Sequence, residues 1–174
     1  MKNIIYLFSL LFCVGFNNCS AQNPSYHRPD SNADKFAGTW KWGDNQDSIT
    51  FIMKKENNVK IIEDNNDLFD IIVGFHKIYK NGLVTEDTTM YSNTNFNDKK
   101  RSIKAITEDG NPNSLIIFMP HKNKNITIKI LYIDSLHIKI INIENQEGAR
   151  FIKSGQNPTD WSIDIPNNII LTKQ

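Results

Sequence analysis

The four histidines are the side chains whose chemistry would stand out most in this chain, but their spacing does not build a site. They are His27, His76, His121 and His137, and no pair has the i, i+2 or i, i+4 spacing that a zinc site with a third ligand would use. His76 lies opposite the more apolar face of a predicted strand, but the inside of a barrel can hold a polar group such as its imidazole. We therefore keep His76 as a candidate ligand-binding residue and predict no metal site.

The sequence lacks the motifs that mark common hydrolases and nucleotide-binding proteins. It contains no Gly-x-Ser-x-Gly nucleophile elbow, no His-Glu-x-x-His motif and no glycine-rich phosphate loop. Aspartates and glutamates are scattered, and no spacing singles out a pair for acid–base catalysis. We predict that the protein is not an enzyme and has no catalytic residues and no cofactor.

The three tryptophans have different expected roles. Trp40 and Trp42 share one parity on a predicted strand, and Trp161 lies next to a predicted loop. Trp40 is expected in the core. Trp42 and Trp161 join His76 as candidate ligand-binding residues because an amphipathic ring suits the mouth of a pocket.

The first 21 residues have the pattern of a secretory signal peptide. Lys2 precedes an apolar run over residues 4–16, which is shorter than the roughly 20 residues that cross a bilayer. Small residues at Cys19 and Ala21 fit cleavage after Ala21 and release of a periplasmic or secreted protein with no transmembrane segment. Lipid attachment at Cys19 is the alternative, which Asn18 fits poorly.

Composition limits the partners and the source of stability. The two cysteines, Cys13 and Cys19, both lie in the predicted signal, so the mature chain is expected to fold without an intrachain disulfide. The chain has 20 Lys and Arg against 19 Asp and Glu, and Lys2 belongs to the signal. A neutral mature chain argues against nucleic acid as a partner.

The rest of the chain has the pattern of an all-β domain. Residues 22–35 contain two prolines and few apolar residues, and we predict a disordered leader there. Residues 36–174 contain short alternating apolar runs separated by Asn, Asp, Gly and Pro, and no long helical periodicity. We predict one domain over 36–174, an antiparallel up-and-down β-barrel of about eight to ten strands.

Two hairpins can be predicted in detail. Asn81-Gly82 is a strong two-residue turn signal, and in the strand before it the odd-numbered residues 69–79 are the more apolar face, which we expect in the core. The second hairpin joins residues 126–132 to 136–140. If Tyr132 pairs with Leu136, a three-residue loop puts the isoleucines of both strands on one face.

Three segments carry a resemblance to known proteins. Residues 38–42 (Gly-Thr-Trp-Lys-Trp) resemble the first strand of lipocalin-like, calycin-type barrels, where a Gly-x-Trp begins the barrel and the Trp closes one end. Together with residues 72–76 (Ile-Val-Gly-Phe-His) and 167–174 (Asn-Asn-Ile-Ile-Leu-Thr-Lys-Gln), they are similar to an uncharacterised domain-of-unknown-function family of small exported bacterial proteins. That family supplies no activity.

The lipocalin resemblance implies a structural motif and one function. In lipocalins a late-chain arginine packs across the motif tryptophan, which implies that Gly38, Trp40 and Arg150 form a structural motif here. It also implies an exported, non-catalytic barrel that binds a small apolar ligand in its interior. The alternative is a structural or protein-interaction module of the bacterial cell envelope, with a packed barrel and a contact surface near Trp161 or the 92–101 loop.

Overall fold

The computed structural model describes residues 26–62, 66–146, 155 and 160–174. Within these residues the secondary structure is almost entirely β. The strands are β1 (His27–Arg28), β2 (Gly38–Gly43), β3 (Ser48–Lys60), β4 (Leu68–Lys80), β5 (Leu83–Asp87), β6 (Ile103–Glu108), β7 (Asn111–His121), β8 (Lys124–Asp134), β9 (His137–Asn145) and β10 (Ile170–Lys173). The short 3-10 helices are η1 (Ser31–Phe36), η2 (Thr89–Tyr91) and η3 (Phe96–Asp98).

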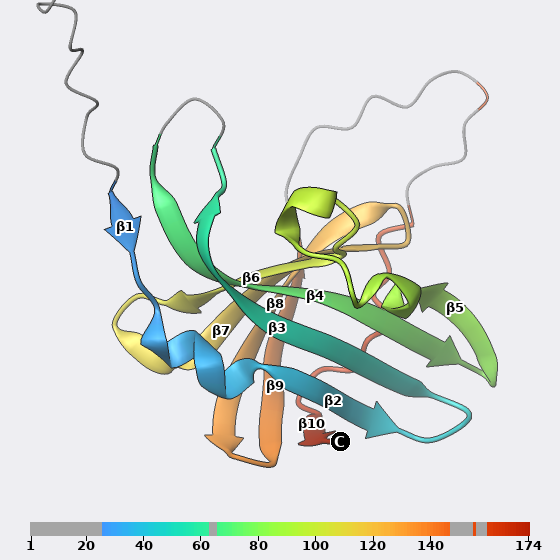
Figure 1. Cartoon of the computed structure of the whole chain (residues 1–174). Helices are drawn as coiled ribbons and strands as arrows, with labels where there is room; N and C mark the ends of the chain where they lie inside the picture. The colour runs from blue at the N-terminus through green and yellow to red at the C-terminus, as the bar shows by residue number, and fades with distance from the viewer. Residues whose placement is uncertain (1–25, 63–65, 147–154, 156–159) are drawn as a thin grey trace, which may run out of the picture.

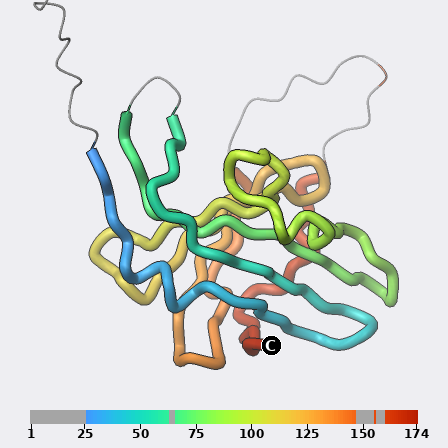
Figure 2. The backbone as a smooth tube through the Cα atoms, viewed as in Figure 1, coloured from blue at the N-terminus to red at the C-terminus, as the bar shows by residue number. Residues whose placement is uncertain are grey.

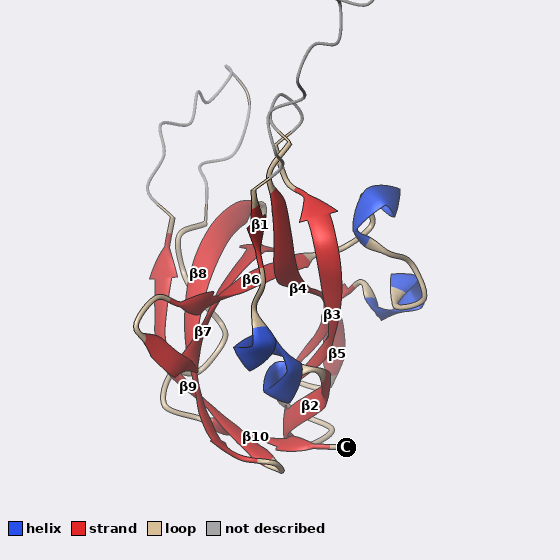
Figure 3. Ribbon diagram, turned by 60° about the vertical axis from the view of Figure 1, so that its left-hand side comes forward, coloured by secondary structure: helices blue, strands red, loops and turns tan. Residues whose placement is uncertain are grey.

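Eight of these strands close into an antiparallel barrel (Figures 1 and 3). Their order is β4-β3-β2-β10-β9-β8-β7-β6, and β6 pairs with β4 to complete the ring. The barrel runs through sequence neighbours, except that β10 lies between β2 and β9, so the C-terminal strand lies beside the first barrel strand (Figure 2). The two further strands both join β4: β5 as a hairpin and β1 as a short parallel strand. The prediction of an antiparallel barrel is confirmed.

The barrel interior is filled with side chains. One cluster of buried apolar residues receives members from every barrel strand and includes Trp40, Phe51, Ile128 and Leu171, all 0 % exposed. An eight-stranded barrel has an interior just wide enough to be filled in this way or to hold one small ligand. Here isoleucine, leucine, methionine and aromatic side chains take the space.

Strand β4 is buried on both of its faces, which reverses the predicted orientation of its side chains. Ile72 and Ile78 belong to the interior cluster, so the even-numbered face points into the barrel. Ile71 and Val73 pack outside the barrel against Phe96 of η3. The prediction that the odd face lines the core is wrong because the loop between β5 and β6 covers that face and makes it equally apolar.

Residues 26–35 are ordered, and the prediction of a disordered leader is wrong for this part of the range. Ala33 and Phe36 of η1 are fully buried in the interior cluster, and η1 contacts β3, β4, β6 and β7. Asp70 accepts hydrogen bonds from His27 Nε2 (3.0 Å) and from the Asp30 N–H (3.2 Å). A few specific contacts fix a polar segment that composition alone describes as disordered. Residues 22–25 and the predicted signal lie outside the described residues.

The Gly-x-Trp segment begins the barrel as predicted. Gly38 has a φ of 138°, and a Cβ there would lie 2.5 Å from Lys173 Cε. Trp40 is fully buried, and its Nε1–H donates a hydrogen bond to the Phe36 carbonyl (2.8 Å). The cation over the ring is Lys173, whose Nζ lies 5.0 Å from the ring centroid. Arg150 lies outside the described residues, so its predicted packing on Trp40 stays a prediction.

The hairpins confirm one predicted turn and correct the other. Asn81-Gly82 joins β4 to β5. In the second hairpin Tyr132 pairs with Ile138 rather than Leu136, and Asp134 pairs with His137 across a two-residue turn. A register shift between Tyr132 and Asp134 inserts one extra residue, and this β-bulge keeps the isoleucines inside with the shorter turn.

Candidate functional site

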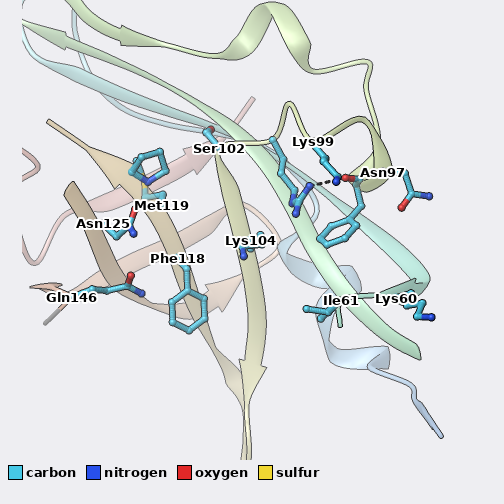
Figure 4. Close-up of a pocket in the computed structure, with 13 residues that line it drawn as sticks. Lys60, Ile61, Asn97, Lys99, Ser102, Lys104, Phe118, Met119, Asn125 and Gln146 are labelled. Atoms are coloured by element: carbon cyan, nitrogen blue, oxygen red, sulfur yellow. Dashed lines mark hydrogen bonds between the residues drawn. The ribbon is translucent and has the colours of Figure 1, made fainter. Parts of the chain in front are cut away.

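A groove of about 700 Å³ lies on the outside of the barrel, between the η3 loop and the outer faces of β6 and β7 (Figure 4). We call it the basic groove. Its charged lining consists of cations: Lys60, Lys99, Arg101 and Lys104. The apolar lining is Ile61, Phe96, Phe118, Met119 and Pro120, and the polar lining is Asn97, Ser102, Asn125 and Gln146.

The floor of the basic groove follows from strand parity. Ile103 and Ala105 of β6 point into the core, so Lys104 between them points outward. On β7 the same alternation turns Phe118 outward, and Lys104 and Phe118 are cross-strand partners. The sheet thus places a cation beside an aromatic ring at the centre of the groove.

The η3 loop forms one wall and is held by a carboxylate beneath it. Glu56 of β3 accepts the Phe96 N–H with both oxygens, at 2.9 and 3.1 Å. The Arg101 guanidinium lies 3.5 Å from the centroid of the Phe96 ring and donates a hydrogen bond to the Phe96 carbonyl at 2.6 Å. Burial lowers the pKa of Arg101 while nearby Glu56 raises it, and an arginine remains charged in either case.

Side-chain amides form the opposite wall. The Gln146 N–H donates to the Asn125 carbonyl (3.0 Å), and Gln146 Nε2 donates to Thr127 Oγ1 (3.3 Å). These bonds fix the end of β9 against the start of β8. In Figure 4, Asn125 and Gln146 lie across Phe118 and Lys104 from Asn97 and Lys99.

The charge of the basic groove contrasts with the balance of the whole chain. Among the residues that the structure describes, four of its lining residues are cations and none is an aspartate or glutamate, whereas the chain has a net charge of +1. Clefts lined by one sign of charge concentrate the field and attract ligands of the opposite sign. Sequence reasoning missed this site. The run Lys99-Lys100-Arg101, followed by Lys104, was the available signal, but the 92–101 loop is predicted only as an alternative contact surface, with no preference for an anion.

A second recess of about 490 Å³, the mouth pocket, contains His76. It is lined by His76, His121, Lys122, Asn123, Pro120, Asp164 and residues 85–88. His76 and His121 have the strand parity of the core residues beside them, so both imidazoles belong to the interior face of the barrel. Glu86 of β5 joins them.

Glu86 is the centre of a buried hydrogen-bonded network. Its Oε2 accepts from His76 Nε2 (2.9 Å), and its Oε1 accepts from the Lys122 N–H (3.1 Å). His121 Nδ1 lies 2.8 Å from Oε1, at an angle outside hydrogen-bond geometry. Burial raises the pKa of Glu86, but the contacts from His121, His76 and Lys122 outweigh burial and hold the pKa well below its usual range.

The network assigns the tautomers of both imidazoles. The Asp164 N–H donates to His121 Nε2 (3.2 Å), so the proton of a neutral His121 lies on Nδ1, facing Glu86. A carboxylate only accepts, so His76 Nε2 carries a proton as well. His76 Nδ1 then contacts Ser102 Oγ at 2.8 Å, and Ser102 Oγ contacts Thr88 Oγ1 at 2.8 Å.

Ser102, His76 and Glu86 have the residue types of a serine hydrolase catalytic triad. Their polar atoms, however, contact neighbouring protein groups. Ser102 is 9 % exposed, and both of its short contacts are with neighbouring protein groups. Thr88 also bonds the backbone of His76, so these contacts link β4, β5 and the start of β6. We interpret these hydrogen bonds as structural contacts that hold the three strands together.

The predicted ligand-binding residues are not brought together. Trp42 is partly buried against the core and lines a small recess of about 50 Å³. His76 is 2 % exposed and engaged by Glu86 and Ser102. Trp161 is 46 % exposed, its carbonyl accepts from Asn145 Nδ2 (3.0 Å), and it lines none of these recesses.

The described part of the chain lacks both a cluster of metal-ligating residues and a membrane-spanning helix. No group of three or more His, Cys, Asp or Glu residues there is arranged to hold a metal ion. No helix there is long and apolar enough to cross a membrane.

Fold and site together define a small antiparallel β-barrel protein with a filled interior and an external basic groove. A model of a family of unknown function (DUF6705) matches residues 1–174, and the chain belongs to that family. Neither the curated proteins nor the solved structures contain a significant match.

Proposed function

We propose that this chain is an exported, non-catalytic binding protein that holds a small organic anion in the basic groove. The observation that carries the proposal is the gathering of four cations in the lining of a groove of about 700 Å³, where no described lining residue is a carboxylate, in a chain of almost zero net charge. Export rests on the signal-like pattern of residues 1–21 and places the function in the periplasm or outside the cell, with lipid attachment at Cys19 as the alternative.

The packing of the barrel supports an external site. An apolar ligand inside the barrel was the first expectation from the sequence, but fully buried side chains such as Phe51, Ile128 and Ile130 fill that space. A filled barrel with a contact surface at the 92–101 loop matches the alternative expectation of an envelope interaction module. Residues of the 92–101 loop form part of the lining of the basic groove.

The lining of the groove defines the chemistry of the ligand. Its volume lies within the roughly 300–1,000 Å³ typical of small-molecule pockets. Five apolar residues, Phe118 among them, provide surface for a ring or short hydrocarbon portion, and the cations provide charge-assisted hydrogen bonds to an acid. A small anion with an apolar or ring portion satisfies both.

A pair of fluorescent probes tests the proposal. 8-Anilinonaphthalene-1-sulfonate is an aromatic anion, and N-phenyl-1-naphthylamine is the same ring system without the sulfonate. We expect the anion to bind with an affinity that falls as salt rises, and the neutral probe to bind at least about tenfold more weakly, which is about 1.4 kcal/mol. Fluorescence titration measures both.

Charge-reversal variants locate the probe. Lys104→Glu should weaken binding of the anionic probe by about tenfold or more. Lys139→Glu makes the same charge change on β9, outside the groove lining, and should leave binding close to that of the natural sequence. Equal effects of the two variants, or tighter binding of the neutral probe, would contradict the proposal.

Absence of catalysis is a separate prediction. Because Ser102 is only 9 % exposed and its hydroxyl is also engaged by Thr88 Oγ1 at 2.8 Å, we expect no covalent labelling of Ser102 by a fluorophosphonate. Intact-mass analysis after exposure to the reagent measures this, with a serine hydrolase as the positive control. A stable adduct mapped to Ser102, and lost in Ser102→Ala, would show an activated nucleophile and overturn the non-catalytic assignment.

A further inference from the structure

We propose that the anion held in the basic groove is an acidic saccharide, a short chain of sugar units that carry carboxylates; this inference rests on the proposed function. The groove has one side that carries cations, together with Asn97, and an opposite side whose described lining residues are uncharged. Lys60, Lys99 and Arg101 come from the end of β3 and the η3 loop, whereas Asn125 and Gln146 come from β8 and the end of β9 (Figure 4). A matching ligand has an acid at one side and neutral hydrogen-bonding groups at the other.

The amide side matches hydroxyl groups. Each side-chain amide offers an acceptor oxygen and two donor hydrogens, and a sugar hydroxyl both donates and accepts. Gln146 Nε2 already donates to Thr127 Oγ1, which fixes this amide at the groove wall. Aliphatic or purely aromatic acids would leave these amides to water and would gain no additional hydrogen bonds from them.

The floor matches the ring of a sugar. Phe118 lies between the cationic and amide sides and gives a flat apolar surface against which the C–H face of a pyranose can pack. Lys104, its cross-strand partner, lies within reach of a carboxylate on the same ring. One sugar unit therefore meets an aromatic surface, a cation and an amide within a single groove.

An acidic peptide fits the groove less well. The commonest way to hold an extended peptide on a sheet is to add it as a further strand along a free edge. At the groove the strands of this floor are paired on both sides, because β6 pairs with β4 over residues 103–105 and with β7, and β7 pairs with β6 and β8. A peptide would depend on side-chain contacts alone.

The test is calorimetric titration of the full mature chain with trigalacturonate, neutral galactotriose and pentaglutamate. The structure predicts binding of trigalacturonate at least tenfold tighter than of galactotriose or pentaglutamate. Lys104→Glu should abolish this binding, and Gln146→Ala should weaken it severalfold while leaving the anionic naphthalene probe bound. Asn142→Ala removes an amide of β9 outside the groove and is the matched control.

The outcomes separate this inference from the proposed function. Equal or tighter binding of pentaglutamate or galactotriose would overturn the saccharide assignment, as would absence of trigalacturonate binding by a protein that binds the naphthalene anion. Failure of the naphthalene anion itself would remove the proposed function and this inference together. Melting temperatures of the variants show that each one is folded during the titration.

Discussion

A chain that ends at Ile169 is expected to lose cooperative folding, the largest effect that the structure predicts. The deletion removes β10, which pairs with β2 on one side and β9 on the other, so the ring of strands opens. It also removes Leu171 from the core and Lys173 from the face of Trp40. An opened barrel exposes two unpaired strand edges and its apolar interior.

Thermal unfolding followed by circular dichroism measures the effect of this deletion. We expect a cooperative transition for the full chain and none for the chain ending at Ile169. A chain ending at Lys173 keeps the whole of β10 and serves as the control. Cooperative melting of the shorter chain within a few degrees of the full chain would show that the barrel does not need its closing strand.

Glu86→Gln is expected to destabilise the fold by about 2–3 kcal/mol at neutral pH. The Glu86 carboxylate accepts hydrogen bonds from His76 Nε2–H and from the Lys122 N–H, and the His121 imidazole faces it. A glutamine amide would point its own hydrogens at one of these donors. Urea unfolding at pH 7 measures the loss. Glu144→Gln, at an exposed carboxylate of β9, is the matched control and should change stability by less than about 0.5 kcal/mol.

The same variant has a predicted pH dependence. The pKa of Glu86 is held below its usual range in the folded state, so the unfolded chain takes up a proton first as pH falls. Its contribution is present above the unfolded pKa of about 4.3 and is lost progressively below that pH. The natural sequence should therefore lose more stability than Glu86→Gln between pH 6 and pH 3. Parallel losses would assign the pH dependence to other carboxylates.

Alternation of apolar residues was sufficient to predict the barrel but not the orientation of every strand. On β8, Ile126, Ile128 and Ile130 are all inside as their alternation predicts, because the outer face of that strand is polar. On β4 both faces are apolar, and periodicity cannot tell a face that lines the core from one covered by a loop. The bulge before the β8–β9 turn could not be predicted from the sequence either. A shorter turn with a bulge and a longer turn without one place the same residues inside.

The candidate site was harder to predict because it is assembled from distant segments. Lys60, Lys104 and Gln146 approach one another only after the barrel closes. His76 was singled out, but the predicted orientation of its strand put it on the face opposite the core, whereas the structure places it on the interior face. Its partners were not singled out, because Glu86 lies on a hairpin that folds back over β4, and Ser102 follows a loop whose path no short motif specifies.

Localisation of the bound anion tests the central claim most directly, namely that the ligand lies outside the barrel. Amide chemical shifts of the isotope-labelled mature protein can be recorded while the naphthalene sulfonate is added. We predict that the largest changes occur at Asn97, Lys104, Phe118 and Gln146, with the core residue Ile128 little affected. Changes concentrated at His121 and Asp164, or throughout the core, would contradict it and place the ligand in the mouth pocket or inside the barrel.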